Sequence, residues 1–137
     1  MLEENCRKEV HELHRFFQEW YSAELPNSAE VFDRLAQVIG ADFEIISPTG
    51  LRCEREQLLE TLHAAHGSDP EARIWIEHAR ARDLGTDMCL VTYEEWQGHG
   101  DAAKGRLSSA LFKTKPDLPN GVEWQHVHEC WLPIEAE

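Results

Sequence analysis

The segment from Gly121 to Pro133, GVEWQHVHECWLP, constrains the fold most, because it reads as one β-strand with bulk on both faces. Side chains alternate along a strand, and one face is expected to carry Trp124, His126, His128 and Cys130. The opposite face is expected to carry Gln125, Val127, Glu129 and Trp131. Aromatic and titratable groups on both faces need cover and hydrogen-bond partners on both sides. We therefore expect this strand to lie in a sheet that is covered on both faces.

The second half of the chain has strand character throughout. Residues 73–84, 88–97, 106–113 and 122–132 each read as strands, and clusters of Gly, Pro, Asp and Asn separate them. The tripeptide Gly85-Thr86-Asp87 is typical of a tight hairpin turn. These runs predict a long antiparallel meander.

The first half is mainly helical. Apolar residues recur every three or four positions over residues 2–23, which predicts a long amphipathic helix. A second helix is expected from a capping sequence at residues 27–30 to about Ile39, and a third over residues 54–66. Short strands at 42–47 and 51–53 lie between the second and third helices. Helices followed by a meander predict one α+β domain over residues 1–137.

Charge and composition exclude several classes of partner. The 137 residues include 13 basic and 26 acidic side chains, a net charge of −13 that disfavours binding to nucleic acid or to anionic membranes. The four cysteines are spread singly, which is typical of buried thiols in a reducing compartment. No apolar run approaches membrane-spanning length, and residues 1–20 lack the apolar core of a signal peptide. We expect a soluble cytoplasmic protein.

Three segments resemble a known family. They are residues 81–85 (ARDLG) leading into 89–93 (CLVTY), residues 107–112 (LSSALF) and residues 124–128 (WQHVH). Together with the order of elements, they make the chain similar to the nuclear-transport-factor-2-like (SnoaL-like) superfamily. The resemblance is closest to the association-domain branch of calcium/calmodulin-dependent kinase II and its stand-alone bacterial relatives. This superfamily hosts isomerases, cyclases, dehydratases and purely binding or oligomerising domains.

The resemblance implies a cone-shaped half-barrel, in which three N-terminal helices pack on a curved, mainly antiparallel sheet. It also implies a pocket on the concave face and a homodimer formed through the convex sheet face. Carried over by position, the pocket residues are Arg80, Arg82, Tyr93, Glu95, Ser108, Ala110, Glu129 and Trp131. The branch commonly has basic residues where this chain has Glu95, Ala110 and Trp131. An acid-containing pocket is therefore expected in place of one for a carboxylate ligand.

Glu95 and Glu129 are the leading candidates for acid/base chemistry. Two carboxylates in a partly dry cavity raise each other's pKa, which prepares one of them to exchange a proton near neutral pH, with Tyr93 as a hydrogen-bond donor. The alternative, which we favour somewhat, is that both carboxylates pair across strands with Arg80, Arg82 or Arg106. A third interpretation, between these two, is that the carboxylates contact a ligand without taking part in a reaction.

Histidines offer weaker candidates for a site. His126 and His128 share one strand face, and Glu94 could complete a metal site with them. We favour a subunit contact there, anchored by Trp96 and Trp124, and expect no metal. The helical pairs His11/His14 and His63/His66 are expected to be solvated or at an edge of the structure, and no phosphate-binding loop or other cofactor motif is present.

These observations predict a small-molecule-binding domain of unestablished activity, with an enclosed pocket in a homodimer. The alternatives are an isomerase, dehydratase or cyclase that uses a pocket carboxylate as general base, and a pure oligomerisation module. Whether the chain is an enzyme stays open. The expected catalytic residues are Glu95, Glu129 and Tyr93. The expected ligand-binding residues are Arg80, Arg82, Ser108 and Trp131, for an unknown small molecule and with no cofactor.

Overall fold

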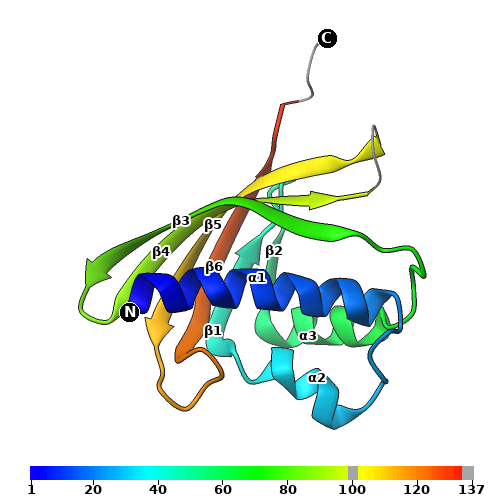
Figure 1. Ribbon diagram of the computed structural model, residues 1–137, viewed down its shortest axis with the longest axis horizontal. Coiled ribbons are helices and arrows are strands. Elements are labelled where there is room, and N and C mark those ends of the chain that lie inside the picture. The colour runs from blue at the N-terminus through cyan, green and yellow to red at the C-terminus, as the bar shows by residue number, and fades with distance from the viewer. Residues whose placement is uncertain (99–101, 134–137) are drawn as a thin grey trace.

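A computed structural model describes residues 1–98 and 102–133 of the chain. The helices are α1 (Leu2–Tyr21), α2 (Ala29–Ala36) and α3 (Arg55–Ala64). The strands are β1 (Ile39–Ile46), β2 (Arg52–Glu54), β3 (Ile74–Gly85), β4 (Met88–Gln97), β5 (Lys104–Thr114) and β6 (Val122–Trp131). Figure 1 shows α1 lying along one face of the sheet, with α2 and α3 beside it. No helix in these described ranges is long and apolar enough to cross a membrane.

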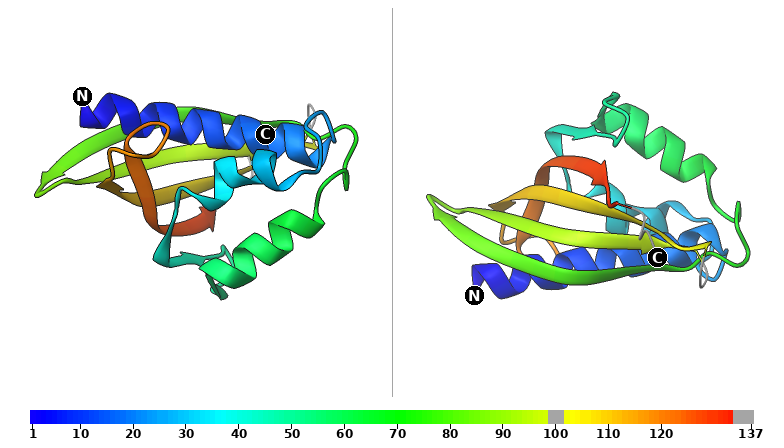
Figure 2. Two further views of the ribbon diagram at one scale, coloured as in Figure 1. Left: turned by 90° about the horizontal axis from the view of Figure 1, so that it is seen from below. Right: turned by 90° about the horizontal axis from the view of Figure 1, so that it is seen from above.

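The six strands form one curved sheet in the order β2-β1-β6-β5-β4-β3 (Figure 2). The strand β1 runs parallel to β6 and the other neighbours are antiparallel, so the sheet is mixed. The α+β class is thereby confirmed. The description of all three helices as N-terminal is not confirmed, because α3 lies between β2 and β3, at the place expected for the third predicted helix.

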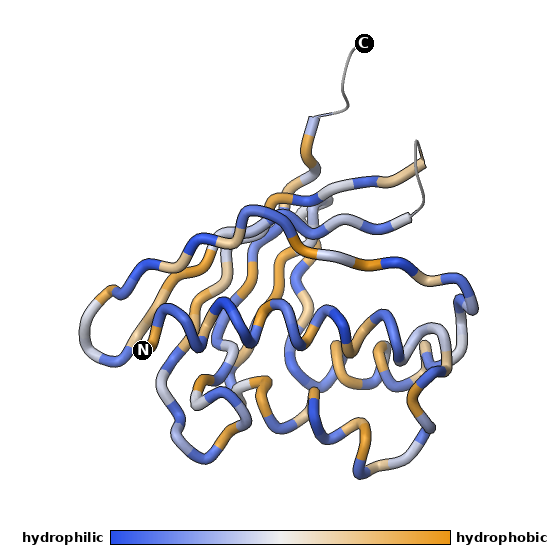
Figure 3. The backbone as a smooth tube through the Cα atoms, in the orientation of Figure 1, coloured by the Kyte–Doolittle hydropathy of each residue, from blue (hydrophilic) through white to orange (hydrophobic). Residues whose placement is uncertain are grey.

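Hydrophobic periodicity accounts for most of these elements. Figure 3 shows hydrophobic and hydrophilic residues alternating along α1 and along the strands. The helix α1 buries one stripe, which packs on the concave face of the sheet: Cys6, Val10, Leu13, Phe16 and Trp20. The helix α2 is capped at its N-terminus by Ser28, whose side-chain oxygen accepts a hydrogen bond from the backbone N–H of Val31 at 3.2 Å. The capping sequence therefore starts this helix as expected.

A β-bulge in β6 changes the face on which Trp124 lies. Phe112 pairs with Trp124, and the preceding residue Leu111 pairs with His126, so Gln125 has no partner across the ladder. Trp124 consequently points into the core, where it is 3% exposed. The prediction that Trp124 shares a face with His126 is wrong, because strict alternation does not hold across a bulge.

A second bulge, in β3, reverses the expected orientation of two arginines. The register shifts between Glu77 and Arg80, and His78 there has φ 56°, in the left-handed region. After the shift, Arg80 pairs with Thr92 and Arg82 pairs with Leu90, so both arginines lie on the convex face and are exposed. The prediction that Arg80 and Arg82 line the concave pocket is therefore wrong.

A buried carboxylate joins α1 to three other parts of the chain. Glu9 is fully buried, and its Oε1 accepts hydrogen bonds from Arg34 Nη2 and Asn120 Nδ2, each at 2.8 Å. Its Oε2 accepts a hydrogen bond from Trp124 Nε1 at 2.9 Å. Glu9 thus ties α1 to α2, to the loop between β5 and β6, and to β6 itself.

Replacing Glu9 with Ala is expected to lower the free energy of unfolding by about 3–5 kcal/mol, because Trp124 loses its acceptor and Arg34 and Asn120 keep only the more exposed Glu12. Urea denaturation followed by circular dichroism measures this loss. Glu12→Ala is the matched control, because Glu12 contacts Arg34 and Asn120 from the same helix but is more exposed. We expect it to cost less than about 1 kcal/mol. Equal losses in the two variants would contradict the assignment of Glu9 as the anchor.

Candidate functional site

The register of the central strands places six side chains in two rows on the concave face of the sheet, which α1 covers. Glu95 pairs with Arg106, and Arg106 pairs with Trp131. In the next row of the concave face, Tyr93 pairs with Ser108, and Ser108 pairs with Glu129. Cross-strand neighbours on one face lie within about 5.5 Å. The rows therefore bring five of the seven predicted site residues together, and Arg106 lies among them.

Arg106 joins the two carboxylates. Its Nη1 donates a hydrogen bond to Glu129 Oε1 at 2.9 Å, and its Nη2 lies 3.8 Å from Glu95 Oε2. Its guanidinium also lies 5.5 Å from the centre of the Trp131 ring, a cation–π arrangement. Glu95 and Glu129 are each only 6% exposed. The interpretation that these carboxylates pair with an arginine is confirmed for Arg106, and the two arginines of β3 take no part.

His14 supplies a second positive charge from α1. Its Nε2 lies 3.2 Å from Glu95 Oε1, and its Nδ1 lies 2.8 Å from the backbone oxygen of Val10. Both ring nitrogens thus face oxygen atoms, and the imidazolium form, which carries hydrogen on both nitrogens, is the form that satisfies both contacts. Gln97 donates to the other oxygen of Glu95 at 2.6 Å. The expectation that His14 is solvated or at an edge is wrong, because it is buried among the apolar residues of its helix.

The titration behaviour of the site follows from burial and from these pairs. Burial by itself would raise the pKa of Glu95, but His14 and then Arg106 lower it to about 2. Burial lowers the pKa of His14, and the carboxylate of Glu95 outweighs this and raises it above its usual value. The pKa of Glu129 is raised by burial, which Arg106 offsets only in part. Burial, and then the two carboxylates, hold the pKa of Tyr93 well above its usual range. Tyr93 is therefore a neutral hydroxyl at every physiological pH.

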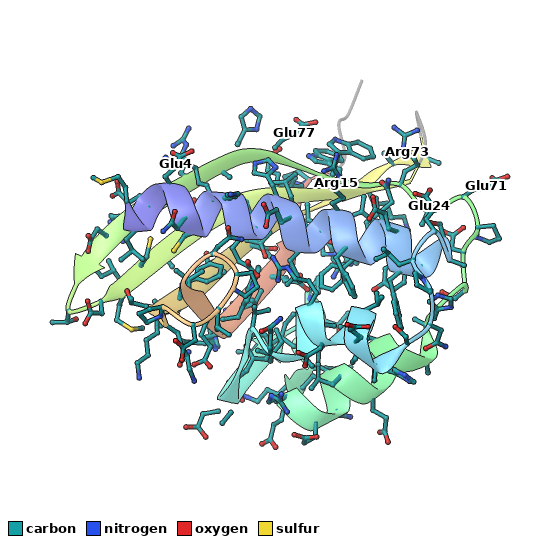
Figure 4. The ribbon with its side chains drawn as sticks, turned by 60° about the horizontal axis from the view of Figure 1, so that its bottom comes forward. Glu4, Arg15, Glu24, Glu71, Arg73 and Glu77 are labelled. Carbon is teal, nitrogen blue, oxygen red and sulfur yellow. The ribbon has the colours of Figure 1, made fainter. Side chains whose placement is uncertain are left out.

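Two adjacent hollows border this network. An inner cavity of ≈160 Å³ lies between α1 and the sheet, and His14, Glu95 and Glu129 line its polar side. An outer hollow of ≈290 Å³ shares Tyr21, Ile74, Gln97 and Arg106 with the inner cavity. The outer hollow is completed by Asp69, Glu71, Ala72, Arg73, Gly98, Ala102, Lys104 and Trp131. Figure 4 shows Glu71 and Arg73 on the segment that leads into β3.

Trp131 and Ser108 differ from the rest of the site, because one is exposed and the other is buried without a hydrogen-bond partner among the described residues. Trp131 is 52% exposed and lies at the rim, where the outer hollow meets solvent. The Ser108 hydroxyl is fully buried and makes no hydrogen bond with any residue in the described part of the chain. Burial of an unpaired hydroxyl is unfavourable. The roles expected for Glu95, Glu129 and Tyr93 in catalysis, and for Ser108 and Trp131 in ligand binding, stay predictions.

The metal ligands considered on β6 do not come together. His126 lies near Glu44, with 3.9 Å between its Nδ1 and the carboxylate, whereas Glu94 contacts His78 at 3.2 Å. His128 is exposed on the same convex face. A site made of His126, His128 and Glu94 is therefore not formed.

Comparison with solved structures defines the class of this protein by its fold. A nuclear-transport-factor-2-like protein of unknown function from Pseudomonas aeruginosa is 23% identical and superimposes with a TM-score of 0.82, over 94% of this chain and 99% of that chain. The calcium/calmodulin-dependent kinase II hub of S. rosetta is 10% identical, with a TM-score of 0.60, over 77% of this chain and 83% of that one. The chain has the nuclear-transport-factor-2-like fold, as its sequence resemblance indicated.

The chain belongs to the sucrose-6-phosphate phosphohydrolase C-terminal family, whose model matches residues 6–133. It is similar to sucrose-phosphatase 1 of Nicotiana tabacum, with 28% identity over 127 residues. That alignment covers 90% of this chain and 30% of the tobacco protein, so the chain spans less than a third of that relative.

The family corrects the functional prediction. The prediction of a small-molecule-binding domain of unestablished activity is wrong in leaving the activity without a class, because both the family and the tobacco relative point to a sucrose-phosphatase-related domain. The same finding replaces the alternatives of isomerase-type chemistry and of a pure oligomerisation module.

The pair of His14 and Glu95 predicts how stability depends on pH. Folding raises the pKa of His14 above its value of about 6.5 in the unfolded chain. The pair therefore stabilises the fold fully below about pH 6.5, and this contribution is lost as the pH rises through the pKa of His14 in the folded state. Because the pKa of Glu95 is lowered to about 2, its contribution is lost only as pH falls from about 4.3 towards 2. Urea denaturation between about pH 6 and 9 should therefore show falling stability.

His14→Gln is expected to be less stable at about pH 6 and to lose most of this pH dependence, because glutamine can donate to Glu95 but does not titrate. His11→Gln is the control, since His11 is exposed on the same helix. It should keep the wild-type slope. A wild-type slope in His14→Gln would show that another group is responsible.

Proposed function

We propose that this chain is an accessory domain of a sucrose-phosphatase-type protein, and that it holds the sugar part of the ligand and does not hydrolyse the phosphate. The proposal rests on the family match over residues 6–133. It also rests on the alignment with the tobacco sucrose-phosphatase, of which this chain spans only 30%. The single domain over residues 1–137 and the cytoplasmic location stay predictions of the same kind.

The charge balance of the inner site argues against phosphate hydrolysis there. Phosphoryl transfer needs cationic groups that are free to neutralise the charge developing on the phosphoryl oxygens. Here Arg106 is engaged by Glu129, and His14 is engaged by Glu95. A phosphate placed among them would meet two carboxylates whose charges already satisfy both cations. We therefore propose that Glu129 holds Arg106 in position and that Glu95 holds His14 in position.

The outer hollow suits a neutral ligand rich in hydroxyl groups. Asp69 and Glu71 balance Arg73 and Lys104 around it, so it carries little net charge apart from the inner network. Carboxylates, amides and guanidinium groups can donate to or accept from hydroxyls, and aromatic rings pack against the C–H faces of a ring-shaped ligand. At ≈290 Å³ the hollow is at the lower end of small-molecule sites, which span roughly 300–1,000 Å³. A sugar ring packed against Trp131 fits this description.

Isothermal titration of the chain with sucrose is expected to give weak, saturable binding, and Trp131→Ala should weaken it at least roughly tenfold by removing the aromatic surface. Trp75→Ala is the matched control, because Trp75 lies on the opposite face of the sheet, and it should bind as the wild type does. Inorganic phosphate should not compete with sucrose. The isolated chain should also release no phosphate from sucrose 6-phosphate. Unchanged binding in Trp131→Ala, or phosphate release that Glu129→Gln abolishes, would overturn the proposal.

We also propose that a second copy of the chain covers the convex face around β5 and β6. Leu107 is 42% exposed there, and Leu111, His128 and Cys130 lie on the same face. One of the solved structures with this fold is described as a hub. Trp124 is not an anchor of this contact, because it lies in the core. Trp96 lies on the convex face and, with the apolar side chains of β5, is proposed to supply it.

Light scattering at micromolar concentration should give the mass of two chains, and Leu107→Glu should give the mass of one, because it buries a charge in the contact. Leu51→Glu is the control, since Leu51 is 71% exposed in the turn between β1 and β2. It should remain a dimer. A wild-type chain that is monomeric under these conditions would rule out this contact.

A further inference from the structure

A second group of ligating side chains lies on the convex face at the edge of the sheet, away from the concave site. Glu77 and His78 of β3 and Glu94 of β4 each offer one ligand atom, and these atoms all lie within 4.8 Å of one another. His78 Nδ1 is 3.2 Å from Glu94 Oε1. Figure 4 shows Glu77 projecting outward from β3. The cluster combines an imidazole with two carboxylates, which is a donor set that zinc binds in proteins.

The bulge in β3 is what brings His78 into this group. In a regular strand, His78 would point to the face opposite that of Glu77. The left-handed backbone of His78, with φ 56°, and the shift of register after Glu77 place both side chains beside Glu94. Histidine is one of the few residue types other than glycine that are enriched in this conformation. The same irregularity that moves Arg80 and Arg82 away from the pocket thus assembles three ligands.

The two carboxylates are unfavourably placed unless a cation joins them. Glu77 and Glu94 are directly opposite one another on neighbouring strands, a position where like charges repel. Among the described residues within reach, His78 is the group that can offset this charge, and its side chain is 65% exposed. A divalent cation between Glu77 and Glu94 would remove the repulsion.

Two indole rings orient these carboxylates from outside the cluster. Trp75 Nε1 donates a hydrogen bond to Glu77 Oε2 at 2.9 Å, and Trp96 Nε1 donates one to Glu94 Oε1 at 3.1 Å. The two rings stack with 6.5 Å between their centres. Hydrogen bonds of this kind fix the direction of ligating groups in metal sites. The free oxygen of each carboxylate is therefore available to a cation.

The geometry points to a zinc-type divalent cation site formed by Glu77, His78 and Glu94, with solvent completing the coordination. Zinc–ligand bonds are about 2.0–2.2 Å long, so small rotations of the exposed Glu77 and His78 side chains bring all three atoms into range. The choice of a borderline-soft cation over magnesium or calcium follows from the imidazole ligand. This site is independent of the proposed function in the concave face.

Titration of the metal-free chain with zinc chloride, by calorimetry and by tryptophan fluorescence, tests the site. We expect one zinc ion per chain and a change in fluorescence from Trp75 and Trp96, whose indoles bond to the ligands. His78→Asn and Glu94→Gln should each weaken binding at least tenfold. Asparagine tolerates the left-handed backbone, and glutamine can still accept from Trp96, so both variants should fold. Cobalt chloride should give visible absorption that the same variants lose.

His128→Asn is the matched control, because His128 is exposed on the same face but is outside the cluster. It should bind zinc as the wild type does, and magnesium chloride should not displace the ion. Zinc binding that is unchanged in both His78→Asn and Glu94→Gln would overturn the assignment, as would equal weakening in His128→Asn. Light scattering with and without zinc separates this site from the subunit contact. A zinc-to-chain ratio of one half, with a zinc-dependent dimer, would also contradict a site within one chain.

Discussion

Two buried charges on α1 determine how this helix lies on the sheet. Glu9 is held by donors from α2 and β6, including Arg34 and Trp124, and five residues further along His14 meets Glu95 of β4. A buried charge without its partner is very unfavourable. The apolar stripe of α1 would tolerate small shifts along the sheet, but such a shift would leave Glu9 or His14 unpaired. The position of the cavity between helix and sheet therefore depends on charge pairing as well as on apolar packing.

The fold could be predicted from the sequence almost completely, and the site only in part. Helices and strands follow local periodicity, so each predicted element is present, with its ends displaced by a few residues. A bulge depends on the partner strand, and periodicity along one strand does not show it. The bulges at His78 and Gln125 therefore account for the wrong faces of Arg80, Arg82 and Trp124. Glu129 and Trp131, which follow the bulge in β6, lie on the predicted face.

Sequence reasoning found the acidic members of the site and offered Arg106 as one of three possible arginine partners, but it missed His14. Glu95 and Glu129 were selected because a resemblance gave the register of their strands. Arg106 lies two residues before Ser108 and so had to share its face, a signal that was available in the sequence. His14 was harder to find, because it is one of a pair of helical histidines and only the tertiary contact with Glu95 distinguishes it from His11. Its position between Leu13 and Phe17, on the apolar stripe, was the one local sign of burial.

In this chain, the relation between fold and function depends on which side chains line the concave face of the sheet. The same curved sheet serves a kinase hub and a sucrose-phosphatase-related domain, so the fold leaves the activity undecided. The features particular to this chain are local: Glu95 is buried in the concave face, and Trp131 lies at its rim. An acid at position 95 requires internal cations, which are His14 and Arg106, and these cations then have no charge left for an anionic ligand. Trp131 is left at the rim with an exposed aromatic face. Charge neutrality inside and an aromatic surface outside are the two structural features that support the proposed binding of an uncharged sugar.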